Sequence, residues 1–333
     1  MSGSNTALVT GAAGFLGSHI ADALLDAGWR VIGVDDFSTS DPDSKHHTDL
    51  IRRKPYKFSQ QSVCDQRTVL ELTAGHSVSL VVNMACPASP PLYQAMPEHT
   101  LMTSVLGAQT CIAVARATAA PKCVILHAST SEVYGDPAIS PQPESYWGCV
   151  SSWGPRACYD EGKRAAEALM WIAKSGGADV RVARIFNTYG PRMRLGDGRV
   201  VTEFVRAILR GEQLPLHGTG SQTRSLCYVS DTVAGLLALA TLPVSPSSPV
   251  NVGSDVEVSM ADLAGIILRQ AGITDAAVCL KPRPVHDPAR RKPDLSLMRS
   301  LTGWAPRVSL EDGLRATLAW FRARAADAAG ETH

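Results

Sequence analysis

The stretch "LVTGAAGFLGSHI", from Leu8 to Ile20, decides the fold of this 333-residue chain. It places Gly11, Gly14 and Gly17 directly after an apolar run typical of a strand and at the start of a helical pattern. Glycines at this position let backbone N–H groups approach a pyrophosphate at the N-terminus of the helix. The GxxGxxG spacing is a weak signal alone, because a glycine-rich turn has the same appearance. Its surroundings therefore decide its meaning.

The first half of the chain alternates between apolar runs and helical patterns. The runs are solid Val/Ile/Leu segments, as in parallel strands that are buried on both faces. This alternation predicts an α/β fold with a Rossmann-type, doubly wound parallel sheet. The predicted strands are Ala7–Thr10, Val31–Asp35, Leu80–Ala85, Val124–Ser129 and Val180–Phe186, and Leu16–Ala27 and Leu101–Thr118 are examples of the helices between them.

After Phe186 the pattern changes to turn-rich segments and short helices, which predicts a smaller mixed C-terminal substrate lobe. We expect residues 1–186 to form an NAD-binding Rossmann domain, to which a later segment, about 226–253, returns. Residues 187–325 are expected to form most of this substrate lobe.

Composition excludes several classes of partner. The chain is 45% hydrophobic and 19% charged with a net charge of +1, which gives no electrostatic footprint for nucleic acid or an anionic membrane. No apolar stretch reaches the roughly 18 residues of a membrane span, and the N-terminus lacks the basic region of a signal peptide. The eight cysteines form neither a CxxC pair nor a zinc-type cluster. We therefore expect no metal site and a cytoplasmic protein with reduced thiols.

An acidic residue supports a dinucleotide site. Asp35 ends the second predicted strand, about 20 residues beyond the glycines, where an acid accepts a hydrogen bond from a ribose 2′-OH. A carboxylate there repels a 2′-phosphate, so NAD is favoured over NADP, although a turn cap is the alternative role. Asp65, after the third strand, is either an adenine contact or a solvated loop acid.

Two further patterns indicate catalysis. In "ACYDEGKRAAEALMW", Tyr159 and Lys163 stand four residues apart and share one helical face, so the lysine is expected to lower the pKa of the tyrosine and to bind the nicotinamide ribose. In "ILHASTSEVYGD", a buried strand ends in Ser129, Thr130, Ser131 and Glu132. A buried strand does not tolerate such groups unless a partner satisfies them, which indicates a bound ligand.

At this point the chain resembles the extended short-chain dehydrogenase/reductase family. Ser131-Glu132 follows the threonine where 4,6-dehydratases carry Asp-Glu, and this is similar to the UDP-glucuronic acid decarboxylase (UDP-xylose synthase) family. The resemblance extends from about Ala7 to Phe321. Its blocks include "ACPASPPLYQ" (85–94), "STSEVYGDP" (129–137), "YWG" (146–148), "GPRACYDEGKR" (154–164), "RIFNTYGPRM" (184–193), "DGRVV" (197–201), "GSQTRS" (220–225) and "RRKPD" (290–294).

The resemblance implies roles for individual residues. Tyr159 is the implied base, Lys163 its partner, and the Thr130 hydroxyl the bridge between substrate and tyrosine. Ser131 is expected to hydrogen-bond the substrate, and Glu132 to orient the sugar or a water and help move protons; the alternative is that both only cap the next turn. The expected cofactor contacts are Gly11, Gly14, Phe15, Leu16, Gly17, Asp35, Asp65, Ala85, Tyr159 and Lys163. The expected substrate contacts are Ser89, Tyr93, Asn187, Gln222, Arg224 and Arg291, with loop packing as the alternative for the first two and a surface charge for the arginines.

The implied activity is the NAD-dependent decarboxylation of UDP-glucuronic acid to UDP-xylose. It would proceed by oxidation at C4, loss of CO₂ from the 4-keto acid and re-reduction, with partial release of UDP-4-keto-xylose as a variant. The alternatives are a UDP-sugar or UDP-uronate 4-epimerase and a non-catalytic NAD-sensing module.

The chain also departs from the family pattern, and these departures put the exact nucleotide sugar in doubt. The main departures are the segment from Cys149 to Trp153 and two acids, Glu203 and Asp36, which each stand where the family usually has an asparagine. The family further implies a homodimer through a four-helix bundle, formed by residues 101–118 and 159–175 of each copy. The alternative is that both helices are simply buried within one subunit.

Overall fold

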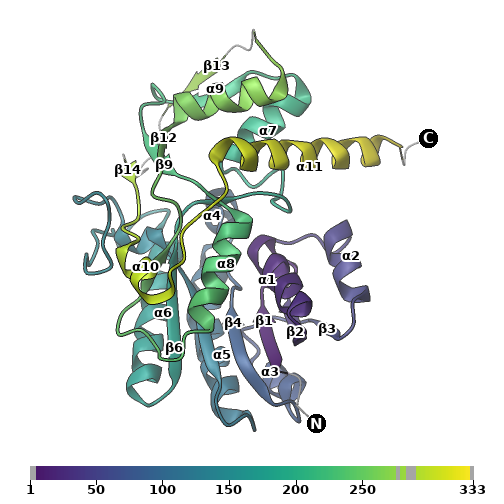
Figure 1. Ribbon diagram of the computed structural model, residues 1–333, viewed down its shortest axis with the longest axis vertical. Helices are drawn as coiled ribbons and strands as arrows, with labels where there is room; N and C mark the ends of the chain where they lie inside the picture. The colour runs from purple at the N-terminus through teal and green to yellow at the C-terminus, as the bar shows by residue number, and fades with distance from the viewer. Residues whose placement is uncertain (1–4, 275–277, 283–289, 331–333) are drawn as a thin grey trace.

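A seven-stranded parallel sheet forms the centre of the computed structural model, which describes residues 5–274, 278–282 and 290–330 (Figure 1). The predicted Rossmann-type doubly wound sheet is confirmed by the strand order β11-β6-β5-β4-β1-β2-β3. Each predicted strand differs from the observed one by no more than two residues at either end. The strands are β1 (Thr6–Thr10), β2 (Arg30–Asp35), β3 (Tyr56–Gln60), β4 (Val78–Asn83), β5 (Val124–Thr130), β6 (Asp179–Ile185) and β11 (Val250–Val252).

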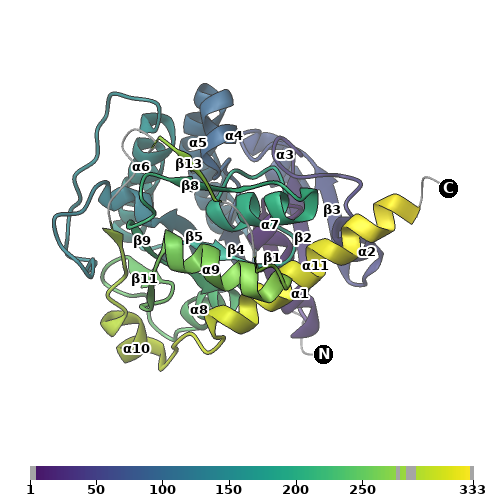
Figure 2. The ribbon, with the colours of Figure 1, turned by 90° about the horizontal axis from the view of Figure 1, so that it is seen from above.

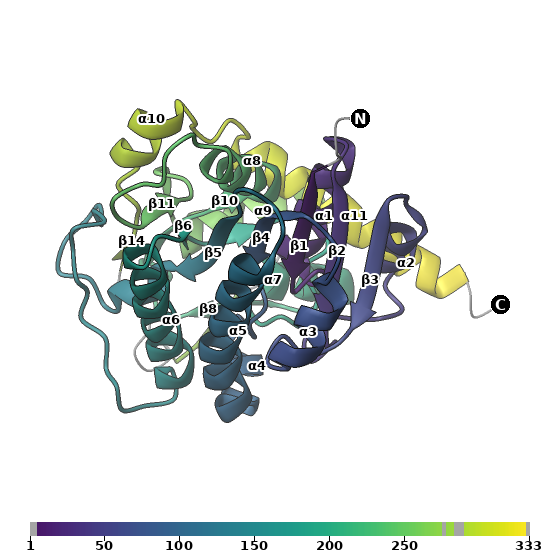
Figure 3. The same cartoon turned by 90° about the horizontal axis from the view of Figure 1, so that it is seen from below.

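Helices cover both faces of this sheet. The helices α3 (Gln66–Thr73), α5 (Pro97–Ala117) and α6 (Ala157–Ser175) lie side by side on one face (Figure 3). The other face carries α1 (Phe15–Asp26) and α8 (Val229–Ala240), which pack against each other. All five residues of β1 are buried, which explains why its sequence shows no alternation between apolar and polar positions.

The reversal of strand order places the site. β1 pairs with β2 on one side and β4 on the other, so a crevice opens at the carboxyl ends of these strands. A buried polar ladder crosses three strands there. Thr10 Oγ1 donates to Asn83 Oδ1 at 3.1 Å, and Asn83 Nδ2 lies 3.1 Å from His127 Nδ1. The ladder ties together the strand ends that carry the cavity described below.

A smaller lobe with mixed sheets stands over these strand ends, as predicted (Figure 2). Its helices are α7 (Val200–Arg210), α9 (Met260–Ala271) and α11 (Leu310–Gly330). Its strands are β7 (Thr188–Tyr189), β8 (Leu214–His217), β9 (Thr223–Ser225), β10 (Cys227–Tyr228), β12 (Glu257–Ser259), β13 (Val278–Lys281) and β14 (Arg290–Arg291). The remaining elements are α2 (Lys45–Arg52), α4 (Pro90–Ala95), the 3₁₀ helix η1 (Ser131–Tyr134) and α10 (Ser296–Thr302).

Two hydrophobic clusters lie in the two parts of the molecule. One lies between the sheet and the α1/α8 face, and it includes Leu236 and Val252 from the late segment. The other contains Phe204, Leu263 and Leu318. The predicted domain boundaries stay a prediction, and residues 1–4, 275–277 and 283–289 of the predicted domains lie outside the described residues. In the described part of the chain, no helix has the length and apolar character of a membrane span.

Candidate active site

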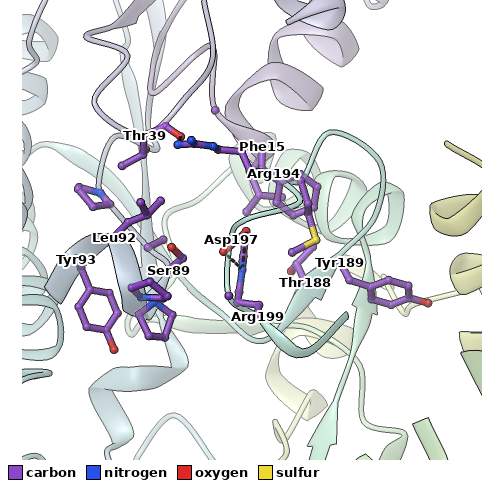
Figure 4. A pocket seen from close by; sticks show the side chains of 18 of the residues that line it. Phe15, Thr39, Ser89, Leu92, Tyr93, Thr188, Tyr189, Arg194, Asp197 and Arg199 are labelled. Atoms are coloured by element: carbon purple, nitrogen blue, oxygen red, sulfur yellow. Dashed lines mark hydrogen bonds and ion pairs between the residues drawn. The ribbon is translucent and has the colours of Figure 1, made fainter. Parts of the chain in front are cut away.

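A cavity of about 1160 Å³ lies between the carboxyl ends of the sheet and the smaller lobe. The two parts meet across it where Arg194 Nη1 donates to the carbonyl oxygen of Thr39 at 2.7 Å (Figure 4). Nearly every residue predicted for the site lines this one cavity. These are Gly11, Gly14, Phe15, Leu16, Gly17, Asp35, Ala85, Ser89, Tyr93, Thr130, Ser131, Glu132, Tyr159, Lys163, Asn187, Gln222, Arg224 and Arg291.

Gly11 and Gly17 have no room for a side chain. Gly11 has a φ of +67°, and a Cβ there would lie 2.9 Å from the backbone nitrogen of Ala85. A Cβ on Gly17 would lie 1.9 Å from the carbonyl oxygen of Gly11. Helix α1 starts at Phe15 with its positive end at the cavity. Bare backbone at a helix N-terminus fits a pyrophosphate, as the sequence predicts.

The Asp35 carboxylate lies beside this loop. It accepts hydrogen bonds from Ala13 N (3.1 Å), Phe37 N (2.9 Å) and Ser40 Oγ (2.7 Å). Burial raises the pKa of Asp35, and these three hydrogen bonds oppose that rise. The carboxylate is thus held rigidly at the cavity wall, in a place that suits a ribose hydroxyl of the dinucleotide.

The structure does not bring Asp65 to the cavity. Its side chain caps α3 instead, where it accepts from Thr68 N at 3.1 Å and from Thr68 Oγ1 at 2.7 Å. These bonds lower the pKa of Asp65 and satisfy the exposed start of the helix. The arrangement matches the solvated-acid alternative better than the adenine contact.

Tyr159 and Lys163 lie on the first turns of α6, on one face. Lys163 Nζ donates to the carbonyl oxygen of Ala128 at 2.8 Å and lies 6.0 Å from the centre of the Tyr159 ring. Both side chains are buried. The bond to β5 fixes the lysine between the strand and the helix, so the predicted i, i+4 pair is present at the cavity.

Burial and neighbouring groups act on the pKa of Tyr159. Burial raises the pKa of Tyr159 well above its ordinary value, and a hydrogen bond with Thr130 only partly opposes this rise. Nearby Cys86, Glu132 and Asp160 raise it further. The lowering of this pKa that is expected from Lys163 stays a prediction.

The hydroxyls at the end of β5 do not all depend on a ligand for a hydrogen-bond partner. Ser129 Oγ donates to Glu167 Oε1 at 2.5 Å, and Glu167 is paired with Arg184 at 2.8 Å. A protein carboxylate from α6 therefore satisfies Ser129. Ser129, Thr130 and Ser131 all line the cavity, and Thr130 Oγ1 accepts from the backbone nitrogen of Glu132 at 3.2 Å.

Glu132 lies between two guanidinium groups. Arg291 donates to both of its carboxylate oxygens, with Nη2 at 2.9 Å from Oε2, and Arg156 donates to Oε2. Burial would raise the pKa of Glu132, but Arg291 and Arg156 outweigh it and hold the pKa well below its ordinary value. Sequence reasoning missed Arg156, whose only signal was its place three residues before Tyr159.

The predicted substrate residues line the same cavity. Ser89, at the start of α4, and Tyr93, one turn on, have buried hydroxyls without a hydrogen-bond partner among the described residues. Gln222 Nε2 donates to the carbonyl oxygen of His217 at 2.9 Å, and Arg224 Nη1 donates to that of Thr223 at 2.8 Å. Asn187 completes this part of the wall.

The departures from the family pattern differ in their placement. Trp153 is 91% exposed and Cys149 is exposed, so that loop contributes neither side chain to the cavity wall. Glu203 does line the cavity, but Arg206, one turn later on α7, pairs with it at 2.6 Å. That pairing neutralises the acid that would otherwise repel a diphosphate. Asp36 also lines the cavity.

Known sequences are similar to this chain over most of its length. Residues 7–253 match the model of the NAD dependent epimerase/dehydratase family. UDP-glucuronic acid decarboxylase 1 of Xenopus tropicalis is 43% identical over 95% of this chain and 72% of its own length. UDP-glucuronic acid decarboxylase 6 of Arabidopsis thaliana is 41% identical over 95% of this chain and 89% of its own length. These identities confirm the predicted resemblance.

Solved structures agree with the fold. A UDP-glucose 4-epimerase from Thermotoga maritima, solved with UDP-glucose, has a TM-score of 0.85 at 27% identity, over 96% of this chain and 99% of that one. A dTDP-glucose 4,6-dehydratase from Streptomyces venezuelae, solved with NAD, has a TM-score of 0.84 at 26% identity, over 96% and 98%. With the family model covering most of the sheet and the cavity, this chain belongs to the NAD dependent epimerase/dehydratase family.

Proposed function

We propose that this protein is a UDP-glucuronate decarboxylase, an NAD-dependent carboxy-lyase that forms UDP-xylose. The observation that carries the proposal is the Glu132 carboxylate between Arg156 and Arg291, in the same cavity wall as Tyr159. Two guanidinium groups beside the catalytic tyrosine suit a sugar that brings its own carboxylate. The names of the relatives at 43% and 41% identity point to the same activity.

The glycine loop and Asp35 would hold NAD. A pyrophosphate would lie against Gly11, Gly14 and Gly17 with the backbone of Phe15 and Leu16 at the start of α1, and Asp35 would receive a ribose hydroxyl. Ala85 is packed against Gly11 at the same wall. When bound, NAD supplies reversible removal of the hydride at C4 of the sugar.

Side chains of this protein would transfer protons and stabilise the charge that develops on the sugar. Tyr159 would take the proton of the C4 hydroxyl, with Thr130 in hydrogen-bond contact and Lys163 fixed behind it. The C4 ketone stands β to the C6 carboxylate, so the sugar can lose CO₂ through an enolate. Tyr159 and Thr130 would stabilise the enolate oxygen, and C5 would take up a proton in place of the lost CO₂. Return of the hydride to C4 and of a proton to its oxygen would then give UDP-xylose. Ser131 would hydrogen-bond the sugar.

Glu132 would position this chemistry. Its carboxylate is fixed by Arg156 and Arg291, and it can orient the sugar or a water for the proton that C5 gains. Ser89, Tyr93, Asn187, Gln222 and Arg224 would complete the nucleotide-sugar contacts.

Incubation with UDP-glucuronate and NAD tests the proposal. The products are identified by mass, CO₂ is measured, and the absorbance of NADH is followed. Release of CO₂ with no rise in NADH supports the closed cycle that ends in UDP-xylose. Release of CO₂ with accumulating NADH indicates that UDP-4-keto-xylose leaves the enzyme. A product isomer of unchanged mass would indicate a 4-epimerase, and NAD binding without turnover would indicate a sensor; either result contradicts the proposal.

We also propose that two copies associate through α5 and α6. Met102 and Ile172 are 44% and 58% exposed on these helices, and Trp171 is exposed as well. Ile112, in contrast, is buried in the cluster between the two helices of one subunit. Met102→Glu and Ile172→Glu should lower the mass measured by light scattering to that of a monomer, whereas Ile139→Glu, in an exposed loop, should not. A wild-type monomer would contradict the proposed homodimer.

A cytoplasmic location is part of the proposal. All eight cysteines lie among the described residues, and each is a free thiol there, which is usual where thiols are kept reduced.

A further inference from the structure

A second carboxyl group lies next to the Glu132 cluster and has no role in the steps above. Asp160 follows Tyr159 on α6 and is only 6% exposed. Its Oδ2 lies 3.6 Å from Nε of Arg156, whose Nη2 donates to Glu132. Asp160 is behind Arg156, because Arg156 lines the cavity and Asp160 does not.

The remaining oxygen of Asp160 is unusual. Oδ1 is buried and has no hydrogen-bond partner within the described part of the chain. An ionised carboxylate in such a place loses its hydration without compensation, whereas a protonated carboxyl loses much less. The charged and titratable groups around it are Glu132 from η1, Arg291 from β14, Tyr93 from α4, and Arg156, Cys158 and Tyr159 from its own helix.

The charges of this cluster determine what it can bind. Arg156 and Arg291 carry two positive charges, and ionised Glu132 and Asp160 carry two negative ones. A uronate carboxylate that enters beside Glu132 would be a third negative group for two guanidinium groups. Burial and the Glu132 carboxylate already raise the pKa of Asp160, to about 7, and Arg156 and Arg291 oppose this only in part. Another anion nearby would raise it further.

We propose that Asp160 takes up a proton when the substrate's carboxylate enters the site, so that Arg156 and Arg291 serve only Glu132 and the uronate. Asp160 is then a positioning residue that acts through Arg156, and it makes binding of the uronate dependent on pH. This inference rests on the proposed function, because it needs a substrate with a carboxylate in this cavity. It assigns to the buried acid a role in making the binding of an anionic sugar, but not of a neutral one, dependent on pH.

Proton linkage predicts the direction in which the affinity for UDP-glucuronate changes with pH. Above the pKa of Asp160 in the free protein, binding of UDP-glucuronate must bring in a proton, so its affinity falls by up to about tenfold for each pH unit. UDP-xylose lacks only the carboxylate and adds no third negative group. Its affinity should therefore change little over the same range of pH, between about 6 and 9.

Calorimetry on the NAD-loaded Tyr159→Phe protein tests this without turnover. Titrations in buffers of different ionisation enthalpy should show uptake of about one proton with UDP-glucuronate near pH 8 and none with UDP-xylose. Asp160→Asn in the same background should abolish the uptake and keep the affinity constant with pH. Glu161→Gln is the matched control, because Glu161 is the next residue of α6 and pairs with Arg164 at 3.6 Å near the surface.

Each outcome of these titrations either supports or overturns the role of Asp160. Equal uptake with both nucleotides, uptake that persists in Asp160→Asn, or a uniform loss of affinity with unchanged pH dependence overturns the role of Asp160. The comparison of the two nucleotides needs no change at Asp160, so it holds even where that variant fails to fold. If wild-type protein releases CO₂ from UDP-glucuronate but shows no linkage, only this inference fails. If the uronate neither binds nor reacts, the proposed function fails with it.

Discussion

The rings of Tyr93 and Tyr159 are stacked, with centroids 5.1 Å apart and an angle of 5° between their planes. Tyr93 comes from α4 and Tyr159 from α6, so the stack joins the loop region after β4 to the catalytic helix. It fixes the rotamer of the tyrosine proposed to exchange a proton with the substrate. The packing of these two rings within the protein therefore orients the Tyr159 hydroxyl.

Tyr159→Phe should therefore keep the stack and lose only the hydroxyl. We expect the rate of decarboxylation to fall by about 10²–10⁴-fold, because a positioned acid/base group is lost, while NAD still binds. Turnover measured by CO₂ release and NAD binding measured by calorimetry check this. Tyr146→Phe, which removes a hydroxyl bonded only to Ala138 N at 3.3 Å, is the control. Turnover of Tyr159→Phe at the wild-type rate would remove Tyr159 as the base.

Lys163→Met should weaken NAD binding. The bond from Nζ to Ala128 O fixes the ammonium group at the cavity wall, and a charged hydrogen bond to a ribose contributes about 1.5–3 kcal/mol. We expect at least about tenfold lower affinity for NAD, measured by calorimetry, together with slower turnover. Lys174→Met, on the last turn of the same helix, should change neither, because its Nζ donates to Pro246 O at 2.6 Å. Unchanged NAD affinity in Lys163→Met would place the ribose elsewhere.

The sequence predicts the parts of this site that depend on local spacing. The glycine loop and the Tyr159/Lys163 pair each lie within one turn or one helix, so residue types at fixed intervals are sufficient. The pairing of Arg291 with Glu132 joins residues 159 positions apart, and only the tertiary fold brings them together. Ser129 likewise meets Glu167 from another element, which the hydroxyl-rich strand end did not indicate.

Elements at the edge of the sheet were also harder to predict. β3 is an edge strand with a mixed burial pattern, and its sequence lacks the solid apolar run of β1 or β4. The sequence predicts β3 only as a third strand, without bounds. Asp65 lies in the same region. It caps the N-terminus of α3, because this helix begins directly after it.

Substitutions of Asp35 and Asp65 should distinguish recognition of the cofactor from capping of a helix. Asp35→Asn removes the negative charge at the cavity wall, so we expect affinity for NAD to fall by about 10- to 100-fold and discrimination against NADP to shrink. Asp65→Asn should leave both affinities unchanged and lower the melting temperature slightly, since its bonds go to Thr68. Calorimetric titration with NAD and NADP checks this. If Asp65→Asn lowered the affinity for NAD as much as Asp35→Asn does, the adenine contact predicted for Asp65 would be supported.

Glu132 offers a test of the decarboxylation step itself. Glu132→Gln keeps a hydrogen-bond acceptor for Arg156 and Arg291 but removes the charge that both guanidinium groups pair with. We expect oxidation at C4, followed as NADH in a single turnover, to be less affected than CO₂ release. NADH should therefore accumulate before CO₂ appears. The reason is that oxidation needs mainly Tyr159 and NAD, whereas the carbanion formed by loss of CO₂ depends on the charges beside C5.

Glu132→Ala should add a loss of stability to this kinetic change. Removing the carboxylate leaves two mostly buried arginines without their main partner, and breaking a buried ion pair costs about 3–5 kcal/mol. A fall in the denaturation midpoint measures this loss. Glu144→Gln is the control, because Glu144 accepts from Asn251 N at 2.9 Å outside the cavity wall. If both Glu132 variants slowed oxidation and CO₂ release equally, Glu132 would only position the sugar, and if neither step slowed, the charges around C5 would not direct the reaction.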